Sequence, residues 1–234
     1  MNKVHRIFMS LLGNRKKSRL PSGYTELEYI TNTSAAYINT GVILDHNNAY
    51  HIHVDNIVMP SVNGWYAVFG CSRIYQSSVY KVYLAYDGVV GHNRLQPAYK
   101  EQFNGQSVVP INTVISSYDA YIQNGSQQYT YKIGSSSYTH NGTSTLSSLG
   151  TALPSFLLFT FNNNGNPVTP NANYFKGGIG EFCITDEGSG TVILDCVSAI
   201  EIATNTVGMY DLVSNTFKTS LSSDSFVAGP IKQL

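Results

Sequence analysis

The chain has 234 residues, of which 42% are hydrophobic and only 12% are charged, whereas about 25% is usual for a soluble domain. Its length allows one large all-β domain or two small ones, with a core that needs no disulfide or metal. The net charge is zero, which excludes a chain that binds nucleic acid through its overall charge.

The charge is concentrated near the N-terminus. Residues 1–20 contain six basic residues and no acidic one, so the rest of the chain carries a net charge of −6. The basic residues are Lys3, Arg6, Arg15, Lys16, Lys17 and Arg19. Such an asymmetry indicates an arm with a partner of its own.

An apolar stripe runs through the same arm. Its members recur at positions i, i+3, i+4, i+7 and i+8, which is the spacing of one face of an α-helix. The stripe consists of Val4, Ile7, Phe8, Leu11 and Leu12, and Gly13–Asn14 follows as a helix stop. We therefore predict that residues 1–19 form a short helical arm that docks on another protein through the stripe. Three cations, Arg15, Lys16 and Lys17, are expected to meet an acidic surface.

Other roles for the arm remain open. The segment IFMSLLG is at the short limit for the apolar core of a signal peptide, and no small-residue cleavage site follows it. A helix on a membrane surface is a second alternative. Docking within the chain's own domain is a third, since a helix this short is marginal alone in water. No run of 18 apolar residues occurs, so we expect no membrane span.

From Leu20 onward, Asn-Gly and related dipeptides divide the chain into short segments. These dipeptides accept the positive φ of tight hairpin turns. The predicted turns lie at 63–64, 87–88, 104–105, 124–125, 141–142, 164–165 and 177–178. The segments between them are rich in β-branched and aromatic residues, which is typical of strands. We therefore predict one all-β domain over residues 20–234.

Three strands are predicted most clearly. AYHIHVDNIV alternates, with His51, His53 and Asp55 on one face and two aliphatic residues on the other. VYKVYLAY, residues 79–86, alternates in the same way, and FLLFTF, residues 156–161, is apolar throughout. The last pattern indicates a central strand buried on both sides. Many short strands with regular turns predict a sandwich or a barrel.

Four segments resemble a known family. LPSGYTELEYITNTSAAYINTGV resembles the opening of phage and gut-bacterial proteins with a concanavalin A-like, laminin-G-like domain. AYIQNGSQQYTY is similar to the central hairpin of that family, and YFKGGIGEFCIT to its late strand. VGMYDLVSNTFKTSLSSDSFVAGP is similar to its closing segment. The resemblance covers about residues 20–230 and implies a jelly-roll sandwich of two antiparallel sheets.

This resemblance implies that residues 23–41 are a wall of the sandwich and not an active site. Their large side chains offer apolar area with phenol tips that can reach solvent or backbone. We expect the following residues to pack in the core: Tyr24, Leu27, Tyr29, Tyr37 and Ile38. Gly41 and Gly208 are expected at turns or bulges.

Candidate catalytic groups are sparse. Retaining glycosidases need two carboxylates about 5 Å apart. Glu26 and Glu28 alternate, but they lie at the edge of the chain beside the first predicted strand. Motifs of serine hydrolases, zinc proteases and P-loop proteins do not occur. We therefore expect no catalytic residue and no enzymatic activity.

Two sets of side chains are candidate metal ligands. Imidazoles and a carboxylate two positions apart on a strand can share an ion, and this set consists of His46, His51, His53 and Asp55. Calcium needs six to eight oxygen ligands, and the oxygen set consists of Asp45, Asn47 and Asn48. Neither set has further anchoring ligands in the sequence, so we expect no metal and no cofactor.

Aromatic residues support an alternative function. Sugars bind to exposed aromatic rings surrounded by Asn, Asp and backbone groups. The candidates for glycan contact are Trp65, Tyr66, Tyr83 and Tyr99. A sandwich also buries most of its aromatic residues, and the sequence does not decide which face they occupy.

The chain has three cysteines, Cys71, Cys183 and Cys196. The odd count argues against a disulfide framework, although Cys183 and Cys196 could face each other on neighbouring strands. We predict three free thiols, as expected for a protein that assembles in a reducing cytosol.

The family resemblance, taken with the basic arm, implies a bacteriophage virion structural protein. The domain of residues 20–234 would be a head fibre or capsid decoration, and the arm of residues 1–19 would anchor it. Expected partners are capsid or fibre subunits and further copies of the chain in a homo-oligomer, with no nucleic acid. The expected location is the virion, after assembly in the bacterial cytoplasm. A glycan-binding adhesin for host-surface carbohydrate is the alternative.

Overall fold

The computed structural model describes most of the chain beyond the predicted arm. The described ranges are 18–43, 48–56, 65–75, 78–89, 92–99, 109–110, 117–124, 128–133, 136–141, 154–163, 165–167 and 174–233. Trp65 and the described residues from 72 to 141 are described by their backbone alone. The predicted arm lies outside the described residues up to residue 17, and with it all eight anchoring residues from Val4 to Lys17.

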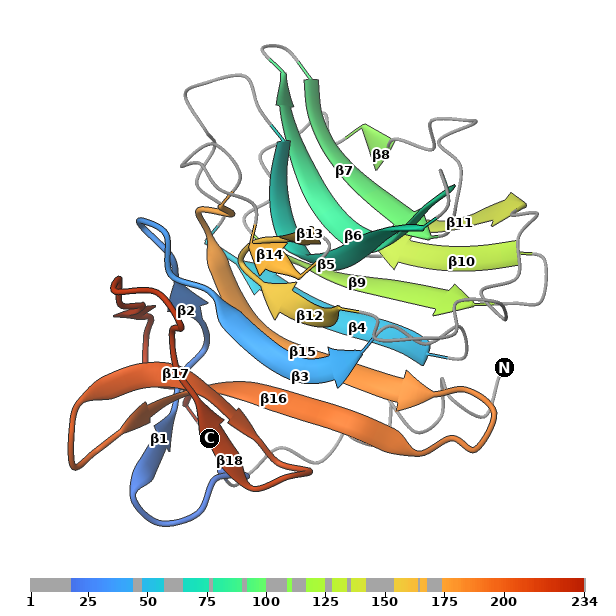
Figure 1. The fold of residues 1–234 in the computed structure, drawn as a ribbon. Coiled ribbons are helices and arrows are strands. Elements are labelled where there is room, and N and C mark those ends of the chain that lie inside the picture. The colour runs from blue at the N-terminus through green and yellow to red at the C-terminus, as the bar shows by residue number, and fades with distance from the viewer. Residues whose placement is uncertain are drawn as a thin grey trace.

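The described part of the chain is all-β and contains no helix (Figure 1). The first strands are β1 (Tyr24–Glu26), β2 (Ile30–Thr31), β3 (Ile38–Ile43), β4 (Asn48–Asp55), β5 (Trp65–Tyr75), β6 (Ser78–Val89), β7 (His92–Tyr99), β8 (Val109–Pro110), β9 (Ser117–Asn124) and β10 (Gln128–Ile133). The later strands are β11 (Ser136–Asn141), β12 (Ser155–Leu158), β13 (Asn162–Asn163), β14 (Asn166–Pro167), β15 (Gly178–Asp186), β16 (Val192–Glu201), β17 (Thr206–Asp211), β18 (Thr216–Lys218) and β19 (Val227–Ala228).

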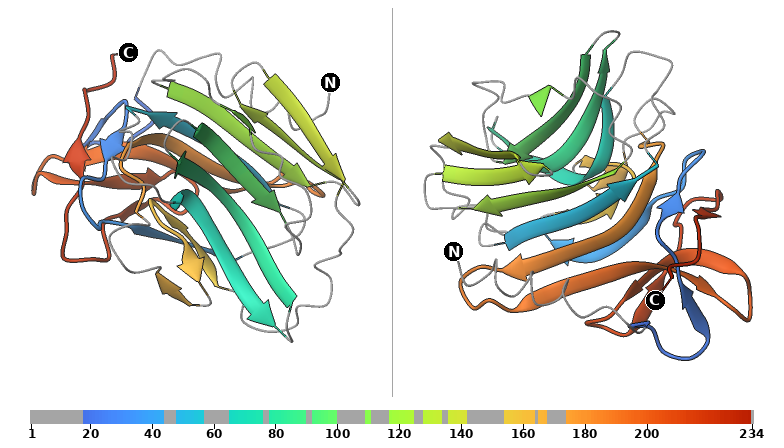
Figure 2. Two further views of the ribbon diagram at one scale, coloured as in Figure 1. Left: turned by 90° about the horizontal axis from the view of Figure 1, so that it is seen from above. Right: turned by 180° about the vertical axis from the view of Figure 1, so that it is seen from behind.

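The strands form two sheets. The first has 11 strands and the order β11-β10-β9-β4-β15-β16-β17-β18. In addition, β1 pairs with β16, β2 pairs with β15, and β19 pairs with β2. The second has 8 strands and the order β14-β13-β5-β6-β7-β8, with β12 joining β3 to β5. Apart from the parallel pair of β13 and β5, the pairings between the described strands are antiparallel. The two sheets lie in separate layers (Figure 2).

Aromatic and aliphatic side chains from both sheets fill the space between the layers. The ring of Phe69 in β5 lies 4.9 Å from that of Phe182 in β15, and the ring of Tyr50 in β4 lies 4.9 Å from that of Phe156 in β12. All four side chains belong to one buried cluster. Because side chains alternate along a strand, Tyr50, Ile52 and Val54 of β4 all face this core.

The predicted strands are confirmed, with one change. The first seven residues of AYHIHVDNIV lie in β4, and VYKVYLAY lies within β6. FLLFTF is buried throughout, but its strand, β12, ends at Leu158 because Phe159 adopts a φ of 66°. That left-handed backbone cannot continue a strand. β12 lies between β3 and β5, as expected for a central strand.

The turns that were predicted from Asn-Gly and related dipeptides are confirmed at some positions and wrong at others. Asn163 pairs with Asn166, so the chain reverses at the predicted position 164–165, where Gly165 has a φ of 95°. Positions 87–88 lie inside β6 and pair with β7. The prediction of a turn there is wrong, because β6 continues to Val89, which pairs with His92.

Gly41 and Gly208, which were both expected at turns or bulges, occupy two different kinds of backbone position. Gly41 has a φ of 78° where the register of β3 against β12 shifts, so the predicted bulge is confirmed. Gly208 lies within β17 and pairs with Ala199, so the predicted turn or bulge is wrong there. A Cβ at Gly208 would collide with the carbonyl oxygen of Lys218. Glycine is needed because β18 approaches closely.

All three cysteines are buried free thiols, which confirms that prediction. Cys183 pairs with Asp195, and Cys196 pairs with Phe182. The two cysteines are therefore offset by one position across the ladder and lie on opposite faces of the sheet. Cys196 belongs to the core cluster, whereas Cys183 lies on the outer face.

Candidate functional site at the junction of the chain ends

Three acidic residues gather on the outer face of the 11-stranded sheet, the face turned away from the core. Glu26 ends β1, Glu181 lies in β15 and Asp195 lies in β16. The register of β15 against β4 shifts between Ile179 and Glu181, so that Ile179 faces the core and Glu181 faces outward. Glu26 and Glu181 are buried, so their charges need partners.

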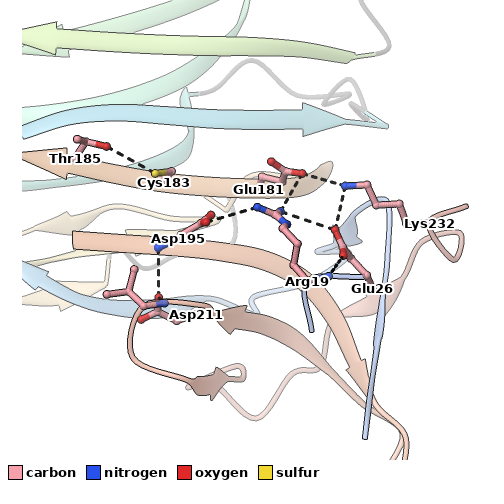
Figure 3. Close-up of polar contacts among 9 residues, drawn as sticks. Arg19, Glu26, Glu181, Cys183, Thr185, Asp195, Asp211 and Lys232 are labelled. Atoms are coloured by element: carbon pink, nitrogen blue, oxygen red, sulfur yellow. Dashed lines mark hydrogen bonds and ion pairs between the residues drawn. The ribbon is translucent and has the colours of Figure 1, made fainter. Parts of the chain in front are cut away.

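Lys232 supplies one of these partners from the other end of the chain. Its Nζ donates to Oε1 of Glu26 at 3.1 Å and to Oε1 of Glu181 at 3.0 Å (Figure 3). The backbone N–H of Lys232 also donates to the carbonyl oxygen of Glu26 at 3.0 Å. A bridge between Leu27 and Ile231 holds the two segments in register. The C-terminal segment is therefore fixed to the sheet by both backbone and side chain.

Arg19 supplies the second cation. Its Nη1 lies 3.5 Å from Oδ2 of Asp195, and its Nη2 lies 3.4 Å from Oε1 of Glu181 (Figure 3). Its backbone N–H donates to Oε2 of Glu26 at 3.3 Å. Nη2 is at ion-pair distance but is not aligned for a hydrogen bond. Its contribution is therefore mainly Coulombic.

These five residues, Arg19, Glu26, Glu181, Asp195 and Lys232, form what we call the junction cluster. Three carboxylates face two cations, so the cluster carries a net charge of −1 when all groups are ionised. The ammonium of Lys232 contacts both glutamates, so the two carboxylates share one cation. This arrangement holds the two ends of the described chain together.

The carboxylate pair considered from the sequence is not assembled. Glu26 points into the junction cluster, whereas Glu28 is exposed and its backbone N–H donates to the carbonyl oxygen of Pro230. A retaining glycosidase needs two carboxylates on either side of a bound sugar. In the junction cluster, the ammonium of Lys232 contacts both Glu26 and Glu181.

Asp211, an acidic residue outside the junction cluster, organises the turn after β17. Its Oδ1 accepts from the backbone N–H of Val213 at 3.1 Å, and its Oδ2 accepts from the hydroxyl of Ser214 at 2.5 Å. Lys218 lies 3.9 Å from the same carboxylate. The side chain of Asp211 therefore has a structural role in the closing segment.

The predicted face of β4 exists, but its histidines are not free metal ligands. His51 is buried opposite Cys183, and His53 is half-buried opposite Glu181. Among the side chains that the structure describes, no group of three or more His, Cys, Asp or Glu residues is arranged to hold a metal ion. Asn48 is buried, and the other calcium candidates, Asp45 and Asn47, lie outside the described residues together with His46.

The structure contradicts one of the four predicted glycan contacts. Tyr66 is 6% exposed and packs in the main core cluster, so its ring cannot stack on a sugar. Alternation along β5 places it on the inner face. Trp65, Tyr83 and Tyr99 lie in β5, β6 and β7, and their side chains are outside the description.

Burial controls the chemistry of the thiol beside the junction cluster. Burial, with a smaller contribution from the carboxylate of Asp195, raises the pKa of Cys183 to about 12. Burial also raises the pKa of Cys71 and of Cys196 well above the usual value. A thiol nucleophile needs a lowered pKa, so these cysteines are structural.

The sequence reasoning missed the junction cluster, although one signal was present. Glu181 is the only charged residue in the apolar run Ile179–Ile184, and a lone acid in such a strand needs a cation nearby. The sequence does not reveal which cations supply it, because Arg19 and Lys232 lie at distant positions in the chain.

Comparison with known proteins does not identify the chain. No protein-family model matches the sequence, and a search of curated proteins gives no match. Among the described residues, no helix has the length and apolar character needed to cross a membrane.

Proposed function

We propose that this chain is a bacteriophage virion structural protein. Its two sheets would form a concanavalin A-like, laminin-G-like jelly-roll that serves as a head fibre or capsid decoration. The helical arm of residues 1–19 would attach it to capsid or fibre subunits, and copies of the chain would associate in a homo-oligomer. The proposal assigns no enzymatic activity to the chain.

One observation carries this proposal. The opening, late and closing segments that resemble the phage family are distant in the sequence but adjacent in the fold. β2 from the opening segment pairs with β15 from the late segment and with β19 from the closing segment. Segments that share one structural unit are expected to resemble one family together, which supports the resemblance as a whole.

The junction cluster supports a role for the arm as an anchor. Arg19, the last residue of the predicted arm, is tied to Glu26, Glu181 and Asp195. An arm that attaches the domain to a particle must itself be fixed to the domain. These ion pairs would fix its last residue. The apolar stripe from Val4 to Leu12 is the surface that would bind the partner.

Particle incorporation tests the proposal. Burial of one large apolar side chain contributes about 1.5–3 kcal/mol, so Phe8→Asp with Leu11→Asp should weaken docking by several tenfold steps at about 1.4 kcal/mol each. We expect this variant to remain folded and to be missing from purified particles. Neutralising Arg15, Lys16 and Lys17 should have a smaller effect that shrinks in high salt, because exposed charges are screened over about 8–10 Å. Incorporation of the aspartate variant at the wild-type level would contradict the proposal.

The glycan-binding alternative is supported by one pair of aromatic residues in the second sheet. Trp65 pairs with Asp87, which lies four positions from Tyr83 in β6, so Trp65 and Tyr83 occupy the same face of the sheet. Tyr99 pairs with Val82 and therefore lies on the opposite face from Tyr83. Glycan-array binding that is lost on Trp65→Ala would favour the adhesin, whereas an arm buried in a different chain would favour the virion protein.

A further inference from the structure

The C-terminal segment lies along the 11-stranded sheet as an added strand. We call residues 227–232 the strap. Within it, β19 pairs with β2, and Ile231 forms a bridge with Leu27 further along in the same register. The backbone N–H of Glu28 donates to the carbonyl oxygen of Pro230 at 2.8 Å. The strap is therefore held by backbone pairing along its length.

The residues that receive the strap also recognise two of its side-chain positions. We call residues 26–31, with Glu181 beside them, the acceptor edge. The ammonium of Lys232 lies 3.1 Å from one glutamate of this edge and 3.0 Å from the other (Figure 3). A Cβ at Gly229 would collide with the ring of Tyr29. The acceptor edge therefore fits an extended segment with a glycine and, three residues later, a lysine.

The strap buries little apolar surface of its own. Val227 is 50% exposed and Ile231 is 65% exposed. By contrast, Phe226 just before the strap is 4% exposed, and its ring lies 4.8 Å from that of Phe159 in the core. A segment with few buried apolar contacts opens at a lower free energy than the core does. The strap can therefore leave the acceptor edge while Phe226 stays in place.

A second copy of the chain carries the same strap and the same acceptor edge. Exchange of an identical segment replaces each contact by its equivalent, which makes it a low-cost route to an oligomer. The lysine would again meet two glutamates, and the glycine would again meet the tyrosine ring. The apolar side chains of Val227 and Ile231, which are exposed within one chain, would then lie where two copies meet.

We propose that the acceptor edge takes the strap of a second copy of this chain. Each of two copies gives a strap and receives one, so the exchange is reciprocal and the pair is closed. This inference rests on the proposed function only in expecting a homo-oligomer, and it names the contact that would hold that oligomer together.

Disulfide formation between two variants tests the exchange. Glu28→Cys and Pro230→Cys, at two exposed positions, are made singly in the full chain and mixed in equal amounts under mild oxidation. Hydrogen-bonded antiparallel neighbours have Cα atoms about 5.5 Å apart, which is within reach of a disulfide. The control replaces Pro230→Cys by Val213→Cys, an exposed position in the turn after β17. Because the exchange brings residues 28 and 230 together, we expect their disulfide to form about tenfold faster or more. Equal rates would overturn the proposal.

The double variant fixes the strap on its own chain. Glu28→Cys with Pro230→Cys is oxidised at low protein concentration, so that the disulfide forms within one molecule, and sedimentation velocity then gives its mass at high concentration. We expect a monomer when the variant is oxidised and the wild-type oligomer when it is reduced. An oligomer that persists in the oxidised form, or a wild type that is monomeric throughout, would overturn the proposal. If this variant unfolds, Thr31→Cys with Val227→Cys, which pair between β2 and β19, takes its place.

Removal of the lysine distinguishes exchange from contact between two closed copies. Lys232→Ala loses the ion pairs with both glutamates, so the strap should open more readily. On this background we expect the disulfide between residues 28 and 230 of two molecules to form about tenfold faster, which corresponds to about 1.4 kcal/mol. Lys176→Ala, at an exposed position, is the matched control. A rate that does not rise above this control would overturn the exchange.

This inference and the proposed function fail separately. Crosslinking and sedimentation use the isolated protein, whereas the proposed function is measured in purified particles. If the straps exchange but particles contain the variant Phe8→Asp with Leu11→Asp at the wild-type level, the acceptor edge stands and the virion anchor fails. If that variant is absent from particles while the oxidised double variant remains an oligomer, the anchor stands and the exchange fails.

Discussion

Phe182 and Cys183 are neighbours in β15, but they lie in two different environments. Phe182 faces inward and packs its ring against Phe69, in a core built from apolar side chains of both sheets. Cys183 faces outward beside Glu181 and Asp195, among thiol, hydroxyl, imidazole and charged groups. Both residues are buried. Burial alone therefore does not distinguish the inner from the outer face of this sheet, whereas the chemistry of the buried groups does.

Truncation of a single side chain on the inner face should lower the free energy of unfolding strongly. Phe182→Ala removes a ring that is fully buried in the core, and such substitutions cost about 3–5 kcal/mol of unfolding free energy. Cys183→Ala on the next position should cost about 1 kcal/mol, the average for a point substitution. Urea unfolding of both variants measures the difference. Equal losses would mean that the outer face is packed as tightly as the core.

Removal of either cation from the outer face should lower the free energy of unfolding by a smaller amount. Arg19→Ala and Lys232→Ala each leave buried carboxylates with one cation fewer. The loss of one partner from a fully buried pair costs about 3–5 kcal/mol, but about a fifth of each cationic side chain is exposed, so we expect roughly 1–2 kcal/mol for each variant. Lys176→Ala on the exposed surface is the matched control and should stay within about 0.5 kcal/mol.

The double variant tests whether the two cations act on the same group of carboxylates. Arg19→Ala with Lys232→Ala leaves Glu26, Glu181 and Asp195 without either cation, so the loss should exceed the sum of the single losses. Urea melts of the four members of the cycle measure this coupling. Strict additivity would show that the two cations act on separate sites and that the junction cluster is not one unit.

The last prediction concerns pH, and its effect is absent at neutral pH. The thiol of an unfolded cysteine loses its proton near pH 9.0, whereas burial raises the pKa of folded Cys183 to about 12. Between these values the unfolded state binds fewer protons, so stability falls as pH rises, and below pH 9 this thiol has no effect. The advantage of the wild type over Cys183→Ala should shrink by about 1.4 kcal/mol per pH unit in this range. A constant difference between pH 9 and 11 would contradict the burial of this thiol.

The inner face was largely predictable from the sequence. Period-2 alternation identified β4 and β6, and the apolar run at 156–161 identified a buried segment. These patterns are local, because a strand carries its own alternation. The end of β12 at Phe159 was not predictable in this way, since tertiary packing imposes its left-handed backbone.

The candidate site was not predictable to the same degree. Glu181 in its apolar strand indicated that a cation was needed, but Arg19 and Lys232 become its neighbours only through the order of β1, β15 and β16. The register that separates Cys183 from Cys196 also depends on this order. Sequence patterns show which side chains face outward, and long-range pairing determines which of them meet.

The pairing of residues 227–232 with residues 26–31 also determines when the domain can be completed during synthesis. Lys232 reaches Glu26 across a separation of 206 residues, and Val227 in β19 pairs with Thr31 in β2. Contacts of this separation close slowly, because the entropy of a long loop is lost before they form. A nascent chain that stalls before Val227 therefore leaves one edge of β2 unpaired, and an open strand edge is a site for aggregation. The segment from Val227 to Lys232 closes that edge once it has been synthesised.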